Sequence, residues 1–383
     1  MFRIVNGRYL VSRATALILL TSSALAQQAK TQGPAERAQA LLKAERYAEV
    51  VALLKGQDRA EEVDPAQLGP LAEAYLELGR YEEAEHALDL LQGLDQGPDT
   101  LNRLARLAAI KGNTDAALKR MDEAVEARAK ILRSTSTVEG ANALAADLTR
   151  HGQLALEAGK LDLALERFRM AIQLVNAAHM KLHEMGIPHD EGDPRMYAGM
   201  ATDGLARVYA AMGDDSRAER TWRNVVGRAN DPAVLVAYGD FLMTRGDSRL
   251  ADRIYERAVQ LAEGKPEHRR TLARFYADQG KNLDQALALA EGSLQGRDDI
   301  EGHDTLAWVR HRRGEHEQAI EPIEKALRTG TNNPRILYHA GMIYQATGRT
   351  DEARKHLERA LQVHQNFDPR DAQAARNALA NLK

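Results

Sequence analysis

One short pattern recurs eight times along the chain and constrains its fold more than any other feature. Each copy places a glycine between two helical stretches, a small residue usually five positions later and a bulky residue about four positions after that, as in GRYEEAEHAL at 79–88. The glycines are Gly79, Gly112, Gly159, Gly213, Gly246, Gly280, Gly314 and Gly348. A glycine ends a helix at low cost because it adopts left-handed backbone, and small residues let two antiparallel helices approach closely. One such hairpin cannot cover its own apolar face, so the pattern predicts a stack of hairpins.

The spacing of these signals resembles that of the tetratricopeptide repeat family, whose period is about 34 residues. The last five glycines, from Gly213 to Gly348, follow one another at intervals of 33 or 34 residues. A weaker first unit starts near residue 31, because ERYAEVVALL (45–54) matches GRYEEAEHAL with Glu45 in the glycine position. The resemblance covers nearly all of 31–366 and implies an all-α, right-handed solenoid of about nine stacked helix pairs.

The repeat predicts how the chain is divided. We expect tetratricopeptide-like repeats over 27–130 and a regular array over 199–366. Residues 131–198 form an irregular unit, in which one helix runs on to about Leu132, another extends from Leu161 to about Met185, and 186–195 form an exposed loop. The final segment, 367–383, reads DPRDAQAARNALANLK from Asp368 onward and predicts a helix that caps the last repeat, with Asp368 at the N-cap and Pro369 after it.

The first 26 residues differ from the rest of the chain. They carry Arg3, Arg8 and Arg13 without an acidic residue, then ATALILL and a small-residue end at Ala24-Leu25-Ala26. This order is typical of a cleavable signal peptide, and its apolar stretch is too short to span a bilayer. We therefore expect an exported protein, periplasmic or secreted, without an integral membrane span after cleavage.

Charge and cysteine content exclude several classes of function. The formal charge of −3 would fall to −6 on loss of the three arginines, so nucleic acid is not an expected ligand. The chain has no cysteine, which rules out disulfides, thiolate metal sites and a cysteine nucleophile. No glycine-rich phosphate loop or nucleophile elbow is present either, so we expect no cofactor and no catalysis.

One insertion suggests chemistry of a different kind. His179 and His183 lie four positions apart on a predicted helix, and His189 follows in HEMGIPHDEGD (183–193). Imidazoles and carboxylates in this arrangement can hold zinc or another divalent ion. The alternative hypothesis is therefore a metal-dependent module or enzyme built on 179–193, against a solvated helix end and polar loop.

The family resemblance implies a different site, on the concave surface formed by the first helix of each pair. The positions that usually face it hold Asn102, Arg106, Arg207, Asp240, Met243, Arg270, Arg274, Trp308, His311, Tyr338 and Met342. Arginines with aromatic and methionine side chains suit a protein or extended peptide of acidic and apolar character. We therefore expect a non-catalytic scaffold for a cell-envelope assembly, such as polysaccharide or outer-membrane machinery. Self-association through continued stacking is the remaining alternative.

Overall fold

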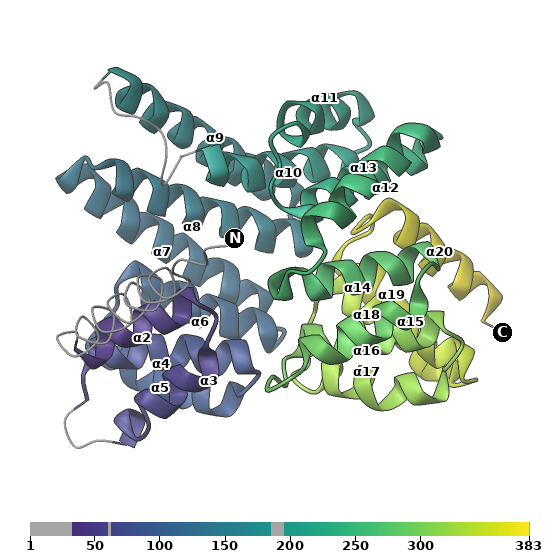
Figure 1. Cartoon of the computed structure of the whole chain (residues 1–383), viewed down its shortest axis with the longest axis horizontal. Coiled ribbons are helices and arrows are strands. Elements are labelled where there is room, and N and C mark those ends of the chain that lie inside the picture. The colour runs from purple at the N-terminus through teal and green to yellow at the C-terminus, as the bar shows by residue number, and fades with distance from the viewer. Residues whose placement is uncertain (1–32, 60–62, 185–194, 383) are drawn as a thin grey trace, which may run out of the picture.

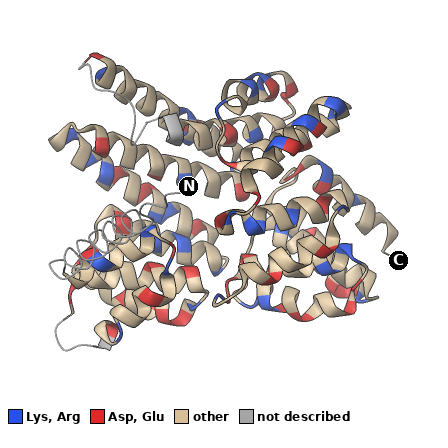
Figure 2. Cartoon of the chain, viewed as in Figure 1, with Lys and Arg blue, Asp and Glu red and all other residues tan. Residues whose placement is uncertain are grey.

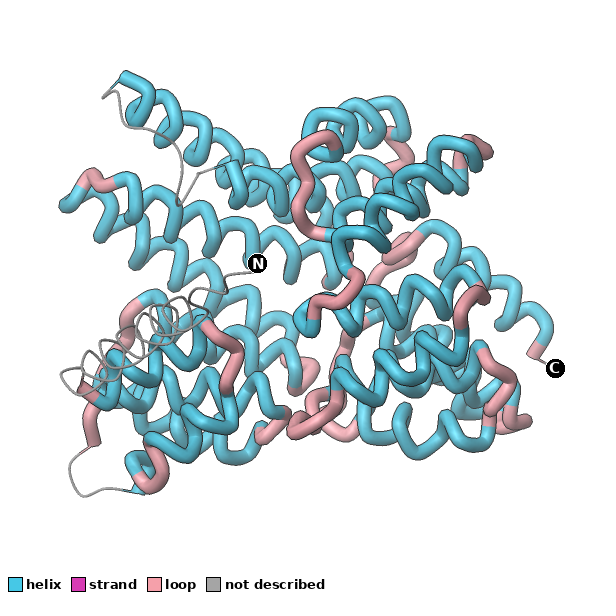
Figure 3. Tube along the Cα trace, viewed as in Figure 1, coloured by secondary structure: helices cyan, strands magenta, loops and turns pink. Residues whose placement is uncertain are grey.

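All regular structure in the described part of the chain is helical. The computed structural model describes residues 33–59, 63–184 and 195–382, which hold 19 α-helices, α2 to α20, and three short 3-10 helices at Gln57–Arg59, Pro266–His268 and Glu317–Ala319 (Figures 1 and 3). The predicted all-α fold is confirmed. None of the described helices is both long and apolar enough to cross a membrane.

The helices pack as consecutive antiparallel pairs that stack on one another. The pairs are α2 (Pro34–Lys43) with α3 (Tyr47–Leu53), α4 (Pro65–Leu78) with α5 (Tyr81–Leu94), α6 (Pro98–Ile110) with α7 (Thr114–Thr135), α8 (Val138–Glu157) with α9 (Leu161–Glu184), α10 (Arg195–Ala211) with α11 (Asp215–Val226), α12 (Pro232–Thr244) with α13 (Ser248–Ala262), α14 (Arg269–Gln279) with α15 (Leu283–Ser293), α16 (Ile300–Arg312) with α17 (Ile320–Leu327), and α18 (Pro334–Ala346) with α19 (Thr350–Val363). The last helix, α20 (Pro369–Asn381), follows α19.

The turn inside each pair has the backbone that the glycine pattern predicts. All eight repeat glycines have positive φ, between 62° at Gly280 and 82° at Gly314. Glu45, which occupies the glycine position of the first unit, also has a positive φ of 54°. Left-handed backbone is costly for a residue with a Cβ atom, so Glu45 adopts it because the repeat geometry requires it there.

The small residues of the pattern lie between the helices. The alanines five or six positions after each glycine are completely buried: Ala84, Ala117, Ala164, Ala218, Ala251, Ala286, Ala319 and Ala353. The first helix of a pair can also carry a glycine where the second helix approaches it closely. A Cβ atom on Gly239 would lie 2.3 Å from Cε1 of Tyr255. Close helix approach therefore depends on these small side chains.

The irregular region contains the longest helices. Helices α7 and α9 are the second helices of their pairs. They run to Thr135 and Glu184, as the extended apolar patterns predict. A left-handed Ser136 and an N-cap hydrogen bond from the Gly140 amide to the Thr137 hydroxyl, 3.0 Å long, separate α7 from α8. The predicted exposed loop at 186–195 lies almost entirely outside the described residues, so it remains a prediction.

The C-terminal helix α20 begins as predicted. The carboxylate of Asp368 accepts hydrogen bonds from the amides of Arg370 and Asp371, at 3.0 and 3.1 Å, and Pro369 occupies the first helical position. Ala375 and Ala378 are buried, and α20 contacts both α18 and α19. It covers an apolar face of the last pair, as a capping helix does.

The stack curls so far that its N-terminal and C-terminal parts touch. We call α2–α9 the N-terminal arm and α14–α20 the C-terminal arm; Figure 1 shows them side by side, joined by α10–α13. The Asp298 amide donates a 2.8 Å hydrogen bond to the Leu78 carbonyl, and Arg297 forms a 2.7 Å ion pair with Glu77. The arms therefore bind each other directly.

The contact continues one repeat further along both arms. The Thr329 hydroxyl donates a 2.7 Å hydrogen bond to the Ile110 carbonyl, and the Asn332 amide donates a 2.6 Å bond to the Gly112 carbonyl. Turns of the N-terminal arm thus meet successive loops of the C-terminal arm. The match in repeat length keeps the two series of contacts in register.

Candidate binding cavity

The closed curl encloses a cavity between the arms, which we call the inter-arm cavity. It has two parts, of about 520 and 340 Å³, that share Gln153, Glu157 and Asn333. Helices α6 and α8 and the loop before α18 line the larger part. Helices α10, α12 and α14 and the start of α20 line the smaller part. First helices from both arms therefore supply most of the lining.

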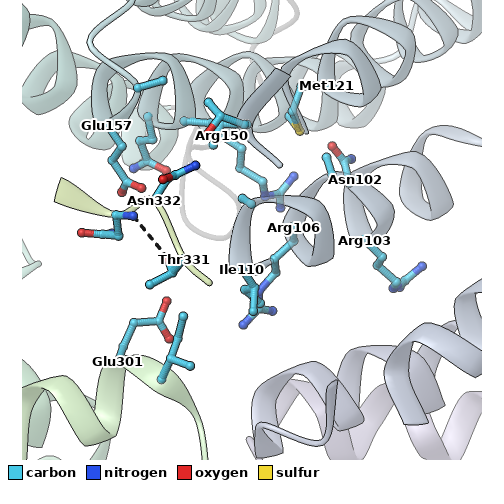
Figure 4. A pocket seen from close by; sticks show the side chains of 18 of the residues that line it. Asn102, Arg103, Arg106, Ile110, Met121, Arg150, Glu157, Glu301, Thr331 and Asn332 are labelled. Atoms are coloured by element: carbon cyan, nitrogen blue, oxygen red, sulfur yellow. Dashed lines mark hydrogen bonds between the residues drawn. The ribbon is translucent and has the colours of Figure 1, made fainter. Parts of the chain in front are cut away.

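Charged side chains of both signs line the larger part, together with apolar ones. Figure 4 shows Arg106 from α6 and Arg150 and Glu157 from α8 around one opening, with Glu301 below them. Arg106 forms ion pairs with Glu73 and Glu77, at 2.9 and 2.7 Å. Desolvation raises the pKa of Glu157, although Arg335 opposes this shift. Carboxylates and guanidinium groups are thus interspersed along the wall, as they are over the rest of the chain (Figure 2).

A group of carboxylates lines the smaller part. Asp240, Asp368 and Asp371 belong to it together with Arg370, whose guanidinium is 3.7 Å from Asp240. Burial raises the pKa of Asp240 to about 6. Burial also raises the pKa of Asp371 well above its ordinary value, and Asp368 and Asp278 add to the shift. These three carboxylates outnumber the one arginine that pairs with them.

Three further arginines, Arg207, Arg274 and Arg335, line the same part. Arg207 forms a 2.7 Å ion pair with Asp203. Arg274 and Arg335 have no side-chain hydrogen bond or ion pair with any described residue, and the buried Nε of Arg335 is unpartnered. The pKa of Arg274 is lowered to about 10, first by the charge of Arg335 and then by desolvation.

The structure brings five of the predicted groove residues to the inter-arm cavity. They are Asn102, Arg106, Arg207, Asp240 and Arg274. Asn102 also donates a 2.8 Å hydrogen bond to Asp147, which holds its side chain against the wall. All five come from first helices, which is where the family resemblance places a concave surface.

The predicted aromatic anchors lie elsewhere, within the packing of the C-terminal arm. Trp308 and Tyr338 are only 3% and 4% exposed, and the Trp308 indole donates a 2.7 Å hydrogen bond to Asp278. The rings of His311 and His339 both stack on Trp308, with centroids at 5.2 and 4.1 Å. Desolvation lowers the pKa of His311 to about 4. The chain's own side chains thus cover these rings.

The other three predicted groove residues do not line the inter-arm cavity. Arg270 forms a 2.9 Å ion pair with the buried Asp299, so it is compensated within the C-terminal arm. Met342 packs partly buried against the core, and Met243 is 43% exposed at the end of α12.

Sequence reasoning missed most of the charged residues of the lining, and three of them show why. Glu157 is the last residue of α8, Arg335 lies in the first turn of α18, and Arg370 comes from α20. Arg335 is the second residue of its repeat unit, a position that usually faces the concave surface, so the repeat did carry a signal for it. Glu157 and Arg370 lie outside such positions, and no periodic signal marks them.

The histidine insertion is only partly described. His179 and His183 lie on the last turns of α9, whereas His189 and the acidic residues after it lie outside the described residues. Within the described ranges, no group of three or more histidine, aspartate or glutamate side chains could hold a metal ion. Metal binding by 179–193 remains a hypothesis.

Comparison with known proteins supports the family resemblance. Two models of the tetratricopeptide repeat family match the sequence, at residues 70–130 and 311–382. These segments hold most of α4–α7 and all of α17–α20, so family repeats occur in both arms. The chain therefore contains tetratricopeptide repeats in these two segments, one in each arm.

Individual relatives match only parts of the chain. Human protein O-mannosyl-transferase TMTC1 is 22% identical over 176 residues, which are 45% of this chain and 20% of that protein. Photosystem I assembly protein Ycf3 of Synechococcus sp. (strain CC9605) is 35% identical over 77 residues, 20% of this chain and 43% of that protein. The chain thus spans less than half the length of either relative.

A solved structure of similar type is a tetratricopeptide repeat protein from Parabacteroides merdae. It is 16% identical, covers 75% of this chain and 100% of its own, and superposes with a TM-score of 0.37. The assignment of the fold therefore rests on the helix pairs of this chain itself.

Proposed function

We propose that this protein is an exported scaffold that holds an extended segment of a partner protein in the inter-arm cavity. The observation that carries the proposal is the charged, continuous lining of that cavity, to which first helices of both arms contribute. A cavity of this kind binds by shape and charge, without a covalent step.

The cellular setting belongs to the same proposal. The basic, apolar and small-residue segments of 1–26 favour export, and a helical scaffold without cysteine suits an extracytoplasmic compartment of either redox state. We propose a role in a cell-envelope assembly, such as polysaccharide or outer-membrane machinery. The partner supplies an extended segment that threads between the arms.

A photocrosslinking experiment tests the cavity directly. A benzoylphenylalanine replaces Gln153, which lines both parts of the cavity, or Lys119, whose side chain is 79% exposed on α7. After irradiation of cells, we expect one envelope protein joined to the Gln153 variant and absent from the Lys119 variant. Mass spectrometry of the adduct identifies the partner and its bound segment.

Two results would contradict the proposal. An adduct formed only from Lys119 places binding on the outer surface. A full-length chain recovered with its first 26 residues in the cytoplasmic fraction rejects export.

A further inference from the structure

Arg274 and Arg335 are exceptions among the arginines that line the inter-arm cavity. The five others each have an ion pair within the described chain: Arg103, Arg106, Arg150, Arg207 and Arg370. Arg274 and Arg335 have none, although they face the same part of the cavity and repel each other. Two uncompensated guanidinium groups in one cavity cost stability unless an anion joins them.

The position of Arg335 adds an independent reason to expect an anion. It is the second residue of α18, a helix of 13 residues. A first helical turn carries partial positive charge, so a cation is unfavourable there unless an anion joins it. The Asn333 side chain already accepts hydrogen bonds from the amides of Arg335 and Ile336, so the guanidinium and not these amides is left to bind an anion. The buried Nε of Arg335 also lacks a hydrogen-bond acceptor among the described residues.

Neighbouring carboxylates do not fill this role. Asp278 accepts the Trp308 indole hydrogen bond at 2.7 Å, and Asp304 is buried against His339 at 2.8 Å. Both attract Arg274 electrostatically, but neither contacts it within ion-pair distance. Glu157 likewise attracts Arg335, and no ion pair joins these two side chains either. The arginine pair therefore still presents free donors to the cavity.

We propose that Arg274 and Arg335, with Arg207 beside them, form a binding site for one carboxylate group of the partner segment. This inference rests on the proposed function and specifies the chemistry of the bound segment. A guanidinium group donates two parallel hydrogen bonds to a carboxylate, and two such groups hold one carboxylate between them.

The carboxylates of the same part of the cavity restrict the segment further. Asp240, Asp368 and Asp371 line it with Arg370 and repel additional negative charge. A uniformly acidic segment fits poorly. The site selects a segment with one carboxylate at the arginine pair and neutral or basic groups beside the aspartates.

Small peptides test the site without knowledge of the partner. The probes are acetyl-Gly-Glu-Gly-amide, acetyl-Gly-Gln-Gly with a free C-terminal carboxylate, and neutral acetyl-Gly-Gln-Gly-amide. Their affinities for the full chain are measured by calorimetry at low ionic strength. We expect at least one charged peptide to bind about tenfold or more tightly than the neutral peptide, because only it forms charge-assisted hydrogen bonds. The preferred peptide distinguishes a side-chain carboxylate from a chain terminus.

The variants are the double substitution Arg274→Gln with Arg335→Gln, and Arg223→Gln as the control. Arg223 lies on α11, where it forms a surface ion pair with Glu219 and is 64% exposed. We expect the double variant to lose the preference for carboxylate and the control to keep it. Without peptide, the double variant should melt at a higher temperature than the wild type at low salt, because the repulsion is gone. A purely structural role for these arginines predicts a lower melting temperature.

Equal binding of all three peptides by the wild type, or no binding, overturns the proposal. So does a double variant that keeps the preference, or a control that loses it. The crosslinking result separates this outcome from failure of the scaffold function. If the Gln153 adduct persists in the double variant, the partner occupies the cavity without using the arginine pair.

Discussion

Single side chains decide how closely the helices of this solenoid approach, and inside a helix glycine is required where an atom already occupies the Cβ position. Gly239 and Gly227 illustrate the difference. A Cβ atom on Gly239 would meet the Tyr255 ring. A Cβ atom on Gly227 would meet no heavy atom within 4 Å apart from its neighbours in the chain. The φ of Gly227 is −60°, which suits any residue. The same substitution should therefore have opposite effects at the two positions.

We expect Gly239→Ala to destabilise the protein. Helix propensity favours alanine by about 1 kcal/mol, but overpacking typically costs about 1–3 kcal/mol. The Tyr255 ring is buried against Phe275 and hydrogen-bonded to Asp240, so it has little room to move. A net loss of about 1 kcal/mol should appear as a lower urea midpoint. Gly227→Ala, the matched control, should be neutral or stabilising, and an equal loss there would contradict the packing explanation.

Asp240 predicts a pH dependence of stability. Its pKa of about 6 exceeds the ordinary aspartate value because of burial. The native state therefore binds more protons than the unfolded state between about pH 4 and 6, so this group's contribution to stability falls as the pH rises through that range. Asp240→Asn keeps the acceptor for the Tyr255 hydroxyl and should stabilise the protein by about 1–2 kcal/mol at pH 7.5. Urea unfolding at pH 4 should show no difference, and a constant gain at both values would reject the assignment.

Each helix pair in a stack is stabilised by packing against a pair on either side, whereas a pair at the end of the stack has such a neighbour on one side only. At the C-terminal end, α20 supplies the missing neighbour, and its apolar face is built from alanines. Ala375 is completely buried, while Ala380 on the opposite face is exposed. The N-cap at Asp368 sets where this helix begins, and the alanine spacing sets which face it buries.

We expect Ala375→Asp to detach α20. A buried unpaired charge costs several kcal/mol, more than one short helix can compensate. The exposed face of α18 and α19 should then promote association between chains. Light scattering at two protein concentrations measures this, together with the melting temperature. Ala380→Asp introduces the same charge at an exposed position and should leave the protein in its wild-type state of association. If both variants behave alike, charge rather than uncapping is responsible.

The closed shape of the molecule depends on contacts between residues more than 200 positions apart. Gly112 touches the C-terminal arm: a Cβ atom there would lie 2.1 Å from the Gly330 carbonyl oxygen. Gly246 has a similar φ, 81° against 73°, but an open environment. The two positions share a backbone conformation and differ only in whether the other arm lies against them.

We expect Gly112→Asn to separate the arms, because the side chain must displace the loop at Gly330. Asparagine tolerates left-handed backbone better than most residues, so the turn itself should survive. Small-angle scattering should report a larger radius of gyration with unchanged helicity by circular dichroism. Gly246→Asn carries the same backbone cost and should keep the compact dimensions. An unchanged radius in Gly112→Asn would show that the arms close without this contact.

The amino-acid sequence by itself determined the parts of this protein that depend on neighbours in the chain. The glycine turns, the buried alanines, the long α7 and α9 and the Asp368 cap all follow from contacts within one helix or between adjacent helices, which recur at a fixed spacing. Five of the predicted groove residues also reach the inter-arm cavity, since repeat geometry places the first helices on one surface.

Only the tertiary structure decided how far the stack curls and what its interior contains. Each repeat adds a small rotation, and the sum over the array brings Leu78 to Asp298 and places Arg335 opposite Arg274. Packing between the adjacent helices α16 and α18 covers Trp308 with the His339 ring. The contacts between the arms join residues more than 200 positions apart, so local patterns carry no signal for them. The cavity and its unpaired arginines arise from accumulated curvature, which depends on the packing of every pair at once.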